Sequence, residues 1–457
     1  MINRTMDPKV DQSPNKKNLL NIAIVLVISV LVVFSTLEYY NSNLRSEEIN
    51  QLKLKINNSG NFSEKAFLHG NNISSNFYQY EGNNLHQFVI NSTPGNFSIK
   101  LNGSIIVDPS YSDGMFFVPI TNMMECTGAL YAVNSTNGKI VWNDSYPNEV
   151  MTEPLIVNDL AIVGLGNNQF VNPNVRGTGI NFISAVNIFN GSSVWEFNTC
   201  GEDMPTPVYH NGLIIEPSGS GIVYAINASN GKQVWNLSTG SFVSMSSPAI
   251  YDGNIYFGGA CPYAFYAVNI TRGNIVWTYY TNATGGLTDG SPVILNGQVF
   301  DGYTVDTGDN VFNDYIFSLN ASNGNLNWLT YEGTGIQPNS PPIEIPPLTA
   351  SGNTVFSEPT SLGKLYAINA ETGNIEWSAV TGTDDSNPAI INGIVLTVNI
   401  TGTLYVINST GCVVNSYKTG VVFGPGNIIV MVHHLILFGN NGVMESIPFT
   451  SIKQIII

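Results

Sequence analysis

One stretch recurs through most of this 457-residue chain. In residues 130–142 it reads Leu-Tyr-Ala-Val-Asn-Ser-Thr-Asn-Gly-Lys-Ile-Val-Trp. Alternating apolar residues predict a strand, Asn and Gly predict a tight turn, and the residues that lead to Trp predict a second strand, so each copy is expected to form a β-hairpin. All six tryptophans of the chain end such a copy: Trp142, Trp195, Trp235, Trp277, Trp328 and Trp377.

A second hairpin is predicted upstream of each copy, where Pro-x-x-x-x-Gly precedes apolar residues, as in Pro207/Gly212 and Pro248/Gly253. Two hairpins make a four-stranded antiparallel unit. The tryptophans are separated by 53, 40, 42, 51 and 49 residues, which is near the period of propeller blades. A parallel solenoid has shorter coils without two tight turns per repeat. The spacing therefore predicts an all-β propeller.

Weaker copies at residues 404–417 and 88–99 extend the count of repeats. The copy at residues 88–99 lacks its upstream hairpin, whereas residues 425–447 have that hairpin but no final strand. Joining these two ends completes one more blade and removes exposed sheet edges. We therefore predict an eight-bladed propeller over residues 85–450, closed by strands from both ends.

The segment before the propeller predicts a membrane anchor. Residues 19–37 form an uncharged apolar run that is long enough to span a bilayer. Basic residues precede it and acidic residues follow it, so residues 1–18 are expected in the cytoplasm. Residues 38–84 are polar and predict a stalk. The chain is thus predicted to be a single-pass cell-membrane protein with an extracellular propeller; a cleaved signal peptide is the alternative.

Sixteen Asn-x-Ser/Thr sequons follow the apolar run and predict a glycoprotein. Acidic residues outnumber basic ones by 32 to 16, and residues 104–447 hold 25 acids against six bases. Such a field repels nucleic acid and suits cations or basic partners. A low density of charge, mostly on protonatable acids, also suits an acidic medium.

The connections between hairpins and between blades are expected to emerge on one face, which we call the long-loop face. Long loops on a rigid scaffold concentrate binding, so this face is the predicted contact surface for a protein, peptide or glycan. Five of its acids mark the candidate binding face: Glu202, Asp203, Asp289, Asp384 and Asp385. A calcium site is predicted at Asp306, Asp309 and Asn310, because Ca²⁺ prefers oxygen ligands. The alternative is that the acids of the long-loop face are only solvated loop charges.

The spacing Ala-x-Asn-x-x-x-Gly-Lys-x-x-Trp in residues 132–142 and 225–235 resembles the tryptophan-docking motif of the pyrroloquinoline-quinone (PQQ) repeat family. This resemblance implies an eight-bladed propeller in which each Trp docks against a neighbouring blade. The family includes quinoprotein alcohol dehydrogenases and non-enzymatic propellers such as the lipoprotein that assists outer-membrane barrel assembly. Membership of this family would therefore indicate the fold but not the function.

The dehydrogenases of that family use an Asp base, Ca²⁺ and often a disulfide between adjacent cysteines. Here Cys126, Cys200, Cys261 and Cys412 are scattered, and no catalytic residue can be carried over. Two of the first three are expected on the long-loop face as a disulfide, with Cys412 unpaired on the other face. The sequence thus favours a non-enzymatic binding or scaffolding module. The alternatives are a PQQ- and Ca²⁺-dependent dehydrogenase and an extracellular sensor.

Overall fold

The computed structural model describes residues 89–167, 179–336, 345–382, 387–424 and 428–451. The predicted cytoplasmic tail, membrane helix and stalk all precede residue 89 and lie outside these ranges. Within the described ranges, no helix has both the length and the apolar character that crossing a bilayer requires.

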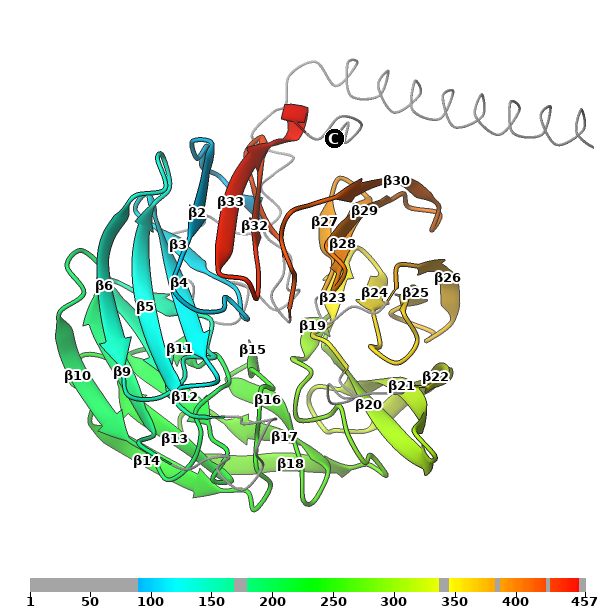
Figure 1. Ribbon diagram of the computed structural model, residues 1–457. Coiled ribbons are helices and arrows are strands. Elements are labelled where there is room, and N and C mark those ends of the chain that lie inside the picture. The colour runs from blue at the N-terminus through cyan, green and yellow to red at the C-terminus, as the bar shows by residue number, and fades with distance from the viewer. Residues whose placement is uncertain (1–88, 168–178, 337–344, 383–386, 425–427, 452–457) are drawn as a thin grey trace, which may run out of the picture. The chain divides into compact units, whose positions relative to one another are not determined.

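Eight antiparallel sheets stand around a common axis and form the blades of a propeller (Figure 1). In seven of them, four consecutive strands pair in order from the axis outward. Blade 1 holds β3 (Ser110–Ser112), β4 (Met115–Asn122), β5 (Thr127–Asn134) and β6 (Ile140–Tyr146). Blade 2 holds β7 (Leu155–Val157), β8 (Leu160–Gly164), β9 (Phe182–Asn187) and β10 (Ser193–Asn198). Blade 3 holds β11 (Val208–His210), β12 (Leu213–Pro217), β13 (Ile222–Asn227) and β14 (Gln233–Ser238).

The following blades repeat this order. Blade 4 holds β15 (Ala249–Tyr251), β16 (Asn254–Gly259), β17 (Ala264–Asn269) and β18 (Asn274–Tyr280). Blade 5 holds β19 (Val293–Leu295), β20 (Gln298–Gly308), β21 (Val311–Asn320) and β22 (Leu326–Ile336). Blade 6 holds β23 (Thr349–Ser351), β24 (Thr354–Ser357), β25 (Lys364–Asn369) and β26 (Ile375–Val380). Blade 7 holds β27 (Ala389–Ile391), β28 (Ile394–Asn399), β29 (Thr403–Ile407) and β30 (Val413–Lys418).

The last blade joins the two ends of the chain, as predicted. β31 (Ile429–Met431), β32 (His434–Phe438) and β33 (Val443–Pro448) come from the C-terminal end and are followed by a 3₁₀ turn at Phe449–Ser451. β2 (Phe97–Lys100) pairs antiparallel with β33 as the outer strand. β1 (Val89–Ile90) pairs parallel with β31 at the inner edge, so this sheet has a fifth strand that the repeat pattern did not predict. The prediction of eight four-stranded blades with a two-ended closure is confirmed.

The tryptophans join one blade to the next. Trp235 donates its Nε1–H to the Ile270 carbonyl of the next blade at 2.9 Å, and its ring lies against Gly273 in that blade's outer turn. Gly273 has φ +61°, and a Cβ there would lie 2.5 Å from the indole, so only glycine fits. Four further indole N–H groups bond in the same way: Trp142 to Ile188, Trp195 to Ala228, Trp277 to Ala321 and Trp328 to Ala370.

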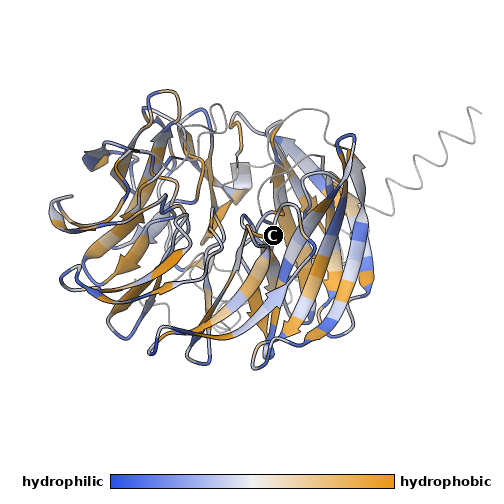
Figure 2. Cartoon of the chain, turned by 90° about the horizontal axis from the view of Figure 1, so that it is seen from below, coloured by the Kyte–Doolittle hydropathy of each residue, from blue (hydrophilic) through white to orange (hydrophobic). Residues whose placement is uncertain are grey.

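Apolar residues run along the strands, and hydrophilic residues occupy many of the turns (Figure 2). The sheets bury both faces against their neighbours, and Phe116, Phe257 and Phe317 are among the fully buried side chains. Each blade's first and second strands, and its third and fourth, are joined by short turns on one face of the propeller. The connectors from an outer strand to the next inner strand run on the long-loop face. These connectors carry the candidate site.

Candidate functional site

On the long-loop face, the connector residues next to the inner strands surround the propeller axis, and we call this region the rim. There the connectors descend to the inner strands, and neighbouring inner strands such as β3 and β7, or β15 and β19, contact one another. The residue four positions before each inner strand occupies the same place in successive connectors. From blade 1 to blade 6 these rim residues are Ile106, Met151, Met204, Met245, Asp289 and Ile345.

Three consecutive rim residues are methionines. Met151 and Met204 are buried and form one hydrophobic cluster with Ile106 and Val107, and the partly buried Met245 packs against it. Met123, from the loop between β4 and β5, packs on the same cluster. Residues from the connectors of four successive blades therefore meet at the rim.

Asp289 continues the rim after Met245. The backbone N–H groups of Met245 and Ser246 both donate to the Thr288 carbonyl at 2.8 Å, which ties the two connectors together. The Thr288 hydroxyl donates to Asp289 Oδ1 at 3.0 Å. Asp289 is partly exposed, and it directly follows the residue whose carbonyl accepts the Met245 N–H.

Asp301, on β20, lies behind Asp289 and is fully buried. Its Oδ1 accepts the Gly302 N–H at 2.8 Å. Burial raises the pKa of Asp301 well above its usual value and the nearby charge of Asp289 raises it further, while the bond from Gly302 opposes both effects. Blade 5 thus holds a buried carboxyl, whose neutral form burial favours, behind a partly exposed one.

A second pair of carboxyls lies in blade 3. Asp203 is fully buried and accepts a hydrogen bond from the Thr199 hydroxyl, and burial raises its pKa to about 8. Glu216, at the end of β12, is also fully buried, and its pKa is raised by burial and then by the charge of Asp203. Asp203 Oδ1 and both Glu216 carboxyl oxygens lack a hydrogen-bond partner among the described residues. Burial therefore favours the neutral form of both groups.

A third pair lies between blades 5 and 6. Asp314 accepts hydrogen bonds from the Thr304 hydroxyl at 2.8 Å and from the Ser361 hydroxyl. Burial raises its pKa, and burial raises the pKa of Glu332 to about 8. In each of the three pairs, burial favours the uncharged form of at least one carboxyl.

The acids predicted as the binding face do not form one solvated surface. Glu202 is 6% exposed and Asp203 is fully buried, so the interpretation as solvated loop charges is wrong for these two residues. Asp289 lies at the rim, as described above. Asp384 and Asp385 lie outside the described residues.

The predicted calcium ligands lie at an exposed hairpin tip between β20 and β21. Asp306 accepts the Gly308 N–H at 2.7 Å through Oδ1. Asp309 and Asn310 have φ of 56° and 59°, as the central residues of a two-residue hairpin turn require. No group of three or more His, Cys, Asp or Glu side chains in the described ranges is arranged to hold a metal ion. Turn geometry accounts for these residues, and calcium binding there stays a prediction.

The expected disulfide is not formed: within the described part of the chain, none of the four cysteines is bonded to another. Sequence reasoning also missed two buried acids, Glu216 and Asp301. Each interrupts an apolar strand, in Leu-Ile-Ile-Glu-Pro and Val-Phe-Asp-Gly, and a charge inside such a run is the signal that could have identified them.

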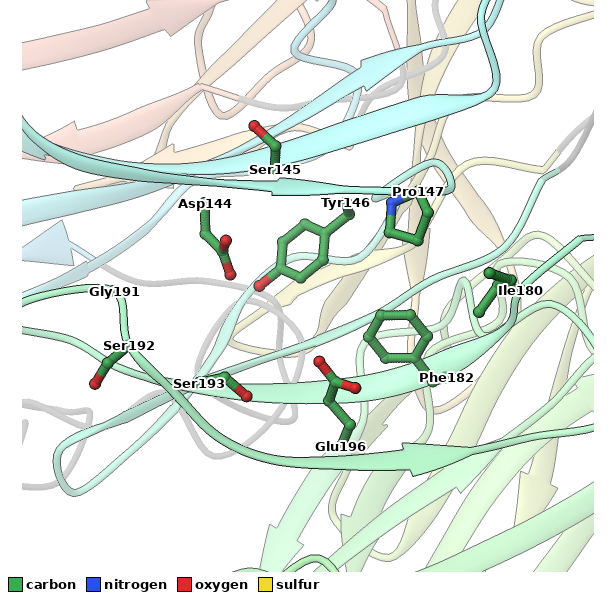
Figure 3. A pocket seen from close by; sticks show the side chains of 10 residues that line it. All are labelled: Asp144, Ser145, Tyr146, Pro147, Ile180, Phe182, Gly191, Ser192, Ser193 and Glu196. Atoms are coloured by element: carbon green, nitrogen blue, oxygen red, sulfur yellow. The ribbon is translucent and has the colours of Figure 1, made fainter.

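A pocket of about 560 Å³ lies away from the rim, along the outer strands β6 and β10 of blades 1 and 2 (Figure 3). Asp144, Tyr146, Phe182 and Glu196 are among its lining residues. Burial raises the pKa of Tyr146, and its hydroxyl lies 3.5 Å from Ser184 Oγ. The rings of Tyr146 and Phe182 meet edge to face, so the wall of this pocket is an inter-blade packing contact.

Comparison with known proteins gives two relatives with the same name. The tetrathionate hydrolase of Acidithiobacillus ferrooxidans is 28% identical over 372 residues, covering 76% of this chain and 73% of the relative. The tetrathionate hydrolase of Acidianus ambivalens is 27% identical over 365 residues, covering 71% and 68%. Both names denote enzymes. The prediction of a non-enzymatic binding or scaffolding module is therefore wrong, and so is the preference against an enzyme.

Other similarities concern the repeat and the fold. The family described as outer membrane protein assembly factor BamB matches residues 181–334. BamB from Moraxella catarrhalis superimposes with a TM-score of 0.58 at 16% identity, covering 78% of this chain and 97% of that one. A quinohemoprotein alcohol dehydrogenase from Pseudomonas putida HK5 gives a TM-score of 0.52 at 11% identity, covering 80% and 76%. These structures share the architecture, and with the tryptophan repeat they identify the chain as a PQQ-like β-propeller.

Proposed function

We propose that this chain is a hydrolase of polythionates, the sulfur chains that carry a sulfonate at each end, with tetrathionate as the first substrate to test. The observation that carries the proposal is the similarity to two tetrathionate hydrolases over more than two thirds of their length and of this chain. The rim of the long-loop face supports it, because a partly exposed aspartate stands there beside a polarisable apolar surface.

Hydrolysis of tetrathionate places the oxygen of water on one sulfur atom and breaks the bond to the next. The bonding electron pair leaves on the second sulfur, which takes up a proton. One protein carboxyl serves both needs if it accepts a proton from the attacking water and returns it to the departing sulfur. Asp289 is our candidate for this role, because it is partly exposed at the rim and oriented by the Thr288 hydroxyl.

Asp301 supports Asp289 by remaining protonated. Two carboxylates so close together would repel each other, and fully buried Asp301 is the one that keeps its proton. Asp289, the partly exposed member of the pair, does not share this burial. Environments that separate two carboxyls in this way are typical of acid–base sites.

The substrate is a dianion, whereas the chain has a formal net charge of −16 at pH 7 and only six Lys and Arg in residues 104–447. A negative field of this kind repels anions. Protonation of the acids other than Asp289 removes the repulsion, and the buried carboxyls already resist ionisation at neutral pH. We therefore propose that the enzyme works best in an acidic medium.

A quinone cofactor fits the described residues poorly. The chain has no adjacent cysteines, and no metal-holding group of His, Cys, Asp or Glu occurs in the described ranges. The fold is shared with a quinohemoprotein dehydrogenase, but at 11% identity this similarity concerns architecture alone. We derive no step through PQQ or Ca²⁺.

We also propose that the propeller works outside the cytoplasm, attached to the cell membrane through residues 19–37. The apolar run, the basic residues before it and the sequons after it support this placement. Protease added to intact cells should degrade the propeller but spare a tag at residue 1. A protected propeller would contradict the proposal.

The test of function is direct. The full-length protein is incubated with tetrathionate between about pH 2 and pH 7, and sulfate, thiosulfate and released protons are measured. Turnover without added cofactor, faster at the acidic end, is expected. A parallel arm adds PQQ, Ca²⁺, an alcohol and an electron-accepting dye. Dye reduction without tetrathionate turnover would overturn the proposal in favour of a dehydrogenase.

A further inference from the structure

We propose that the methionines of the rim form the subsite for the sulfane sulfur atoms of the substrate, meaning those between its two sulfonate ends, and so set its preference for sulfur-chain length. We call Met123, Met151, Met204 and Met245 the methionine arc. The inference rests on the proposed function. It assigns to the arc a recognition role that is separate from the chemistry of Asp289.

The position of the arc carries the inference. Met151, Met204 and Met245 occupy equivalent places in three successive connectors, and all pack in one cluster with Met123. Met151 and Met204 are 3% and 2% exposed, whereas Met123 and Met245 are partly exposed. Two methionines of the arc are therefore partly exposed, and two are buried in the same cluster.

The chemistry of the arc matches the middle of a polythionate. The terminal sulfonates are hard and charged, but the sulfur atoms between them are uncharged, polarisable and poorly hydrated. Thioether side chains are also soft and polarisable, and they adapt to irregular shapes. An apolar arc at the rim of an acidic propeller is thus a favourable place for a sulfur chain and an unfavourable one for hydrated anions.

The arc also lies in the right place relative to the proposed acid–base group. Met245 N–H donates to the Thr288 carbonyl at 2.8 Å, and Asp289 is the next residue along the chain. A sulfur chain lying along the arc would therefore bring one of its bonds toward the Asp289 carboxyl. Longer chains would use more of the arc, whereas a chain with a single sulfane sulfur would use only the part nearest Asp289.

The test compares trithionate, tetrathionate and pentathionate, which contain one, two and three sulfane sulfurs. Met245→Leu conserves side-chain volume and removes the thioether, and Met123→Leu provides a second variant at a partly exposed position. For pentathionate we expect kcat/KM to fall about threefold to tenfold, mainly through KM. For trithionate we expect a change of less than about twofold.

Met431→Leu is the matched control, because Met431 is fully buried in inner strand β31 and packs in the core cluster of the closing blade. It should leave the chain-length profile unchanged. Equal losses for all three substrates in Met245→Leu and Met123→Leu would overturn the methionine subsite while leaving the proposed hydrolase intact.

Failure of the proposed function gives a different result. If the wild-type protein hydrolyses none of the three substrates, calorimetric titration with the same polythionates replaces the kinetic assay. Binding that strengthens with chain length and weakens in Met245→Leu would support the subsite. Absent or length-independent binding would overturn it.

Discussion

The stability of this propeller should fall as pH rises, and Asp203 allows the effect to be measured at one residue. The carboxyl is fully buried, and its pKa rises from 3.8 to about 8, primarily because burial penalises the charged form. In the unfolded chain the same group titrates near its ordinary value. Its neutral form therefore stabilises the folded state fully below about pH 4, and that stabilisation is lost progressively as pH rises toward 8.

Across this interval, the loss of one proton changes the free energy of unfolding by about 1.4 kcal/mol for each pH unit. The whole interval would correspond to about 6 kcal/mol, and relaxation around an ionised carboxylate lowers the expected value to about 3 kcal/mol. Asp203→Asn keeps the shape of the neutral side chain and removes the titration. Relative to wild type, this variant should therefore gain free energy of unfolding steadily between about pH 4 and pH 8.

Guanidinium unfolding of both proteins across that range measures the effect. The informative quantity is how the difference in free energy of unfolding between Asp203→Asn and wild type varies with pH. The new amide itself adds a contribution to that difference that does not vary with pH. Glu216 titrates in both proteins, so its own contribution largely cancels, apart from its coupling to Asp203. Asp252→Asn serves as the control, since Asp252 is an exposed turn residue with φ 47° that asparagine also adopts. A difference between Asp203→Asn and wild type that stays constant with pH would refute the reasoning.

Further predictions concern the blade contacts and the rim. Gly273→Ala should lower the free energy of unfolding by about 2 kcal/mol or more, because a Cβ would meet the Trp235 ring at 2.5 Å. Gly212→Ala, where φ is +87° and nothing lies within 4 Å of the new Cβ, should lower it by only about 1 kcal/mol. Denaturant titration compares the two variants. Trp235→Phe should cost about 1 to 3 kcal/mol, because the Ile270 carbonyl loses its donor, and equal unfolding midpoints in variant and wild type would contradict this. Asp289→Asn should lower kcat for tetrathionate by at least about a hundredfold with an unchanged unfolding transition, and near-normal kcat would exclude Asp289 as the acid–base group.

Much of the architecture could be predicted, because the sequence pattern within each repeat determines its strands and turns. Alternating apolar residues, turn glycines and a recurring Trp specify four strands per unit, and the incomplete repeats at the two ends specify how the ring closes. The pairing of β1 with β31 at the inner edge was not predictable. That strand has two residues and uses parallel backbone pairing, which leaves little trace in side-chain pattern.

The candidate site was harder to predict, because it is assembled by the ring rather than by any one repeat. Met151, Met204, Met245 and Asp289 stand in separate repeats and share only their distance from the next inner strand. The loop acids were predicted to form a binding face, with solvated charges as the alternative, yet Asp203 is buried in the connector before the inner strand of blade 3. Burial of this kind depends on neighbouring blades, so the sequence of one connector does not reveal it.

The similarity to enzymes was not predicted from the sequence, for a related reason. The sequence motif resembles quinoprotein dehydrogenases, so the sequence was compared with those enzymes. The absence of their adjacent cysteines argues against quinoprotein chemistry, but it says nothing about other reactions. A propeller rim can support other reactions with a pair of neighbouring carboxyls. Asp289 and Asp301 form such a pair, and Asp301 was not recognised because it lies inside a strand.

The central claim is that the rim hydrolyses a sulfur–sulfur bond with Asp289 as its acid–base group. The most direct measurement is tetrathionate turnover by the wild-type protein and by Asp289→Asn at about pH 3, with sulfate and protons quantified together. The account predicts turnover without added cofactor in the wild type and its near-complete loss in the variant, whose fold is unchanged. Absence of turnover in the wild type, or equal turnover in the two proteins, would contradict it.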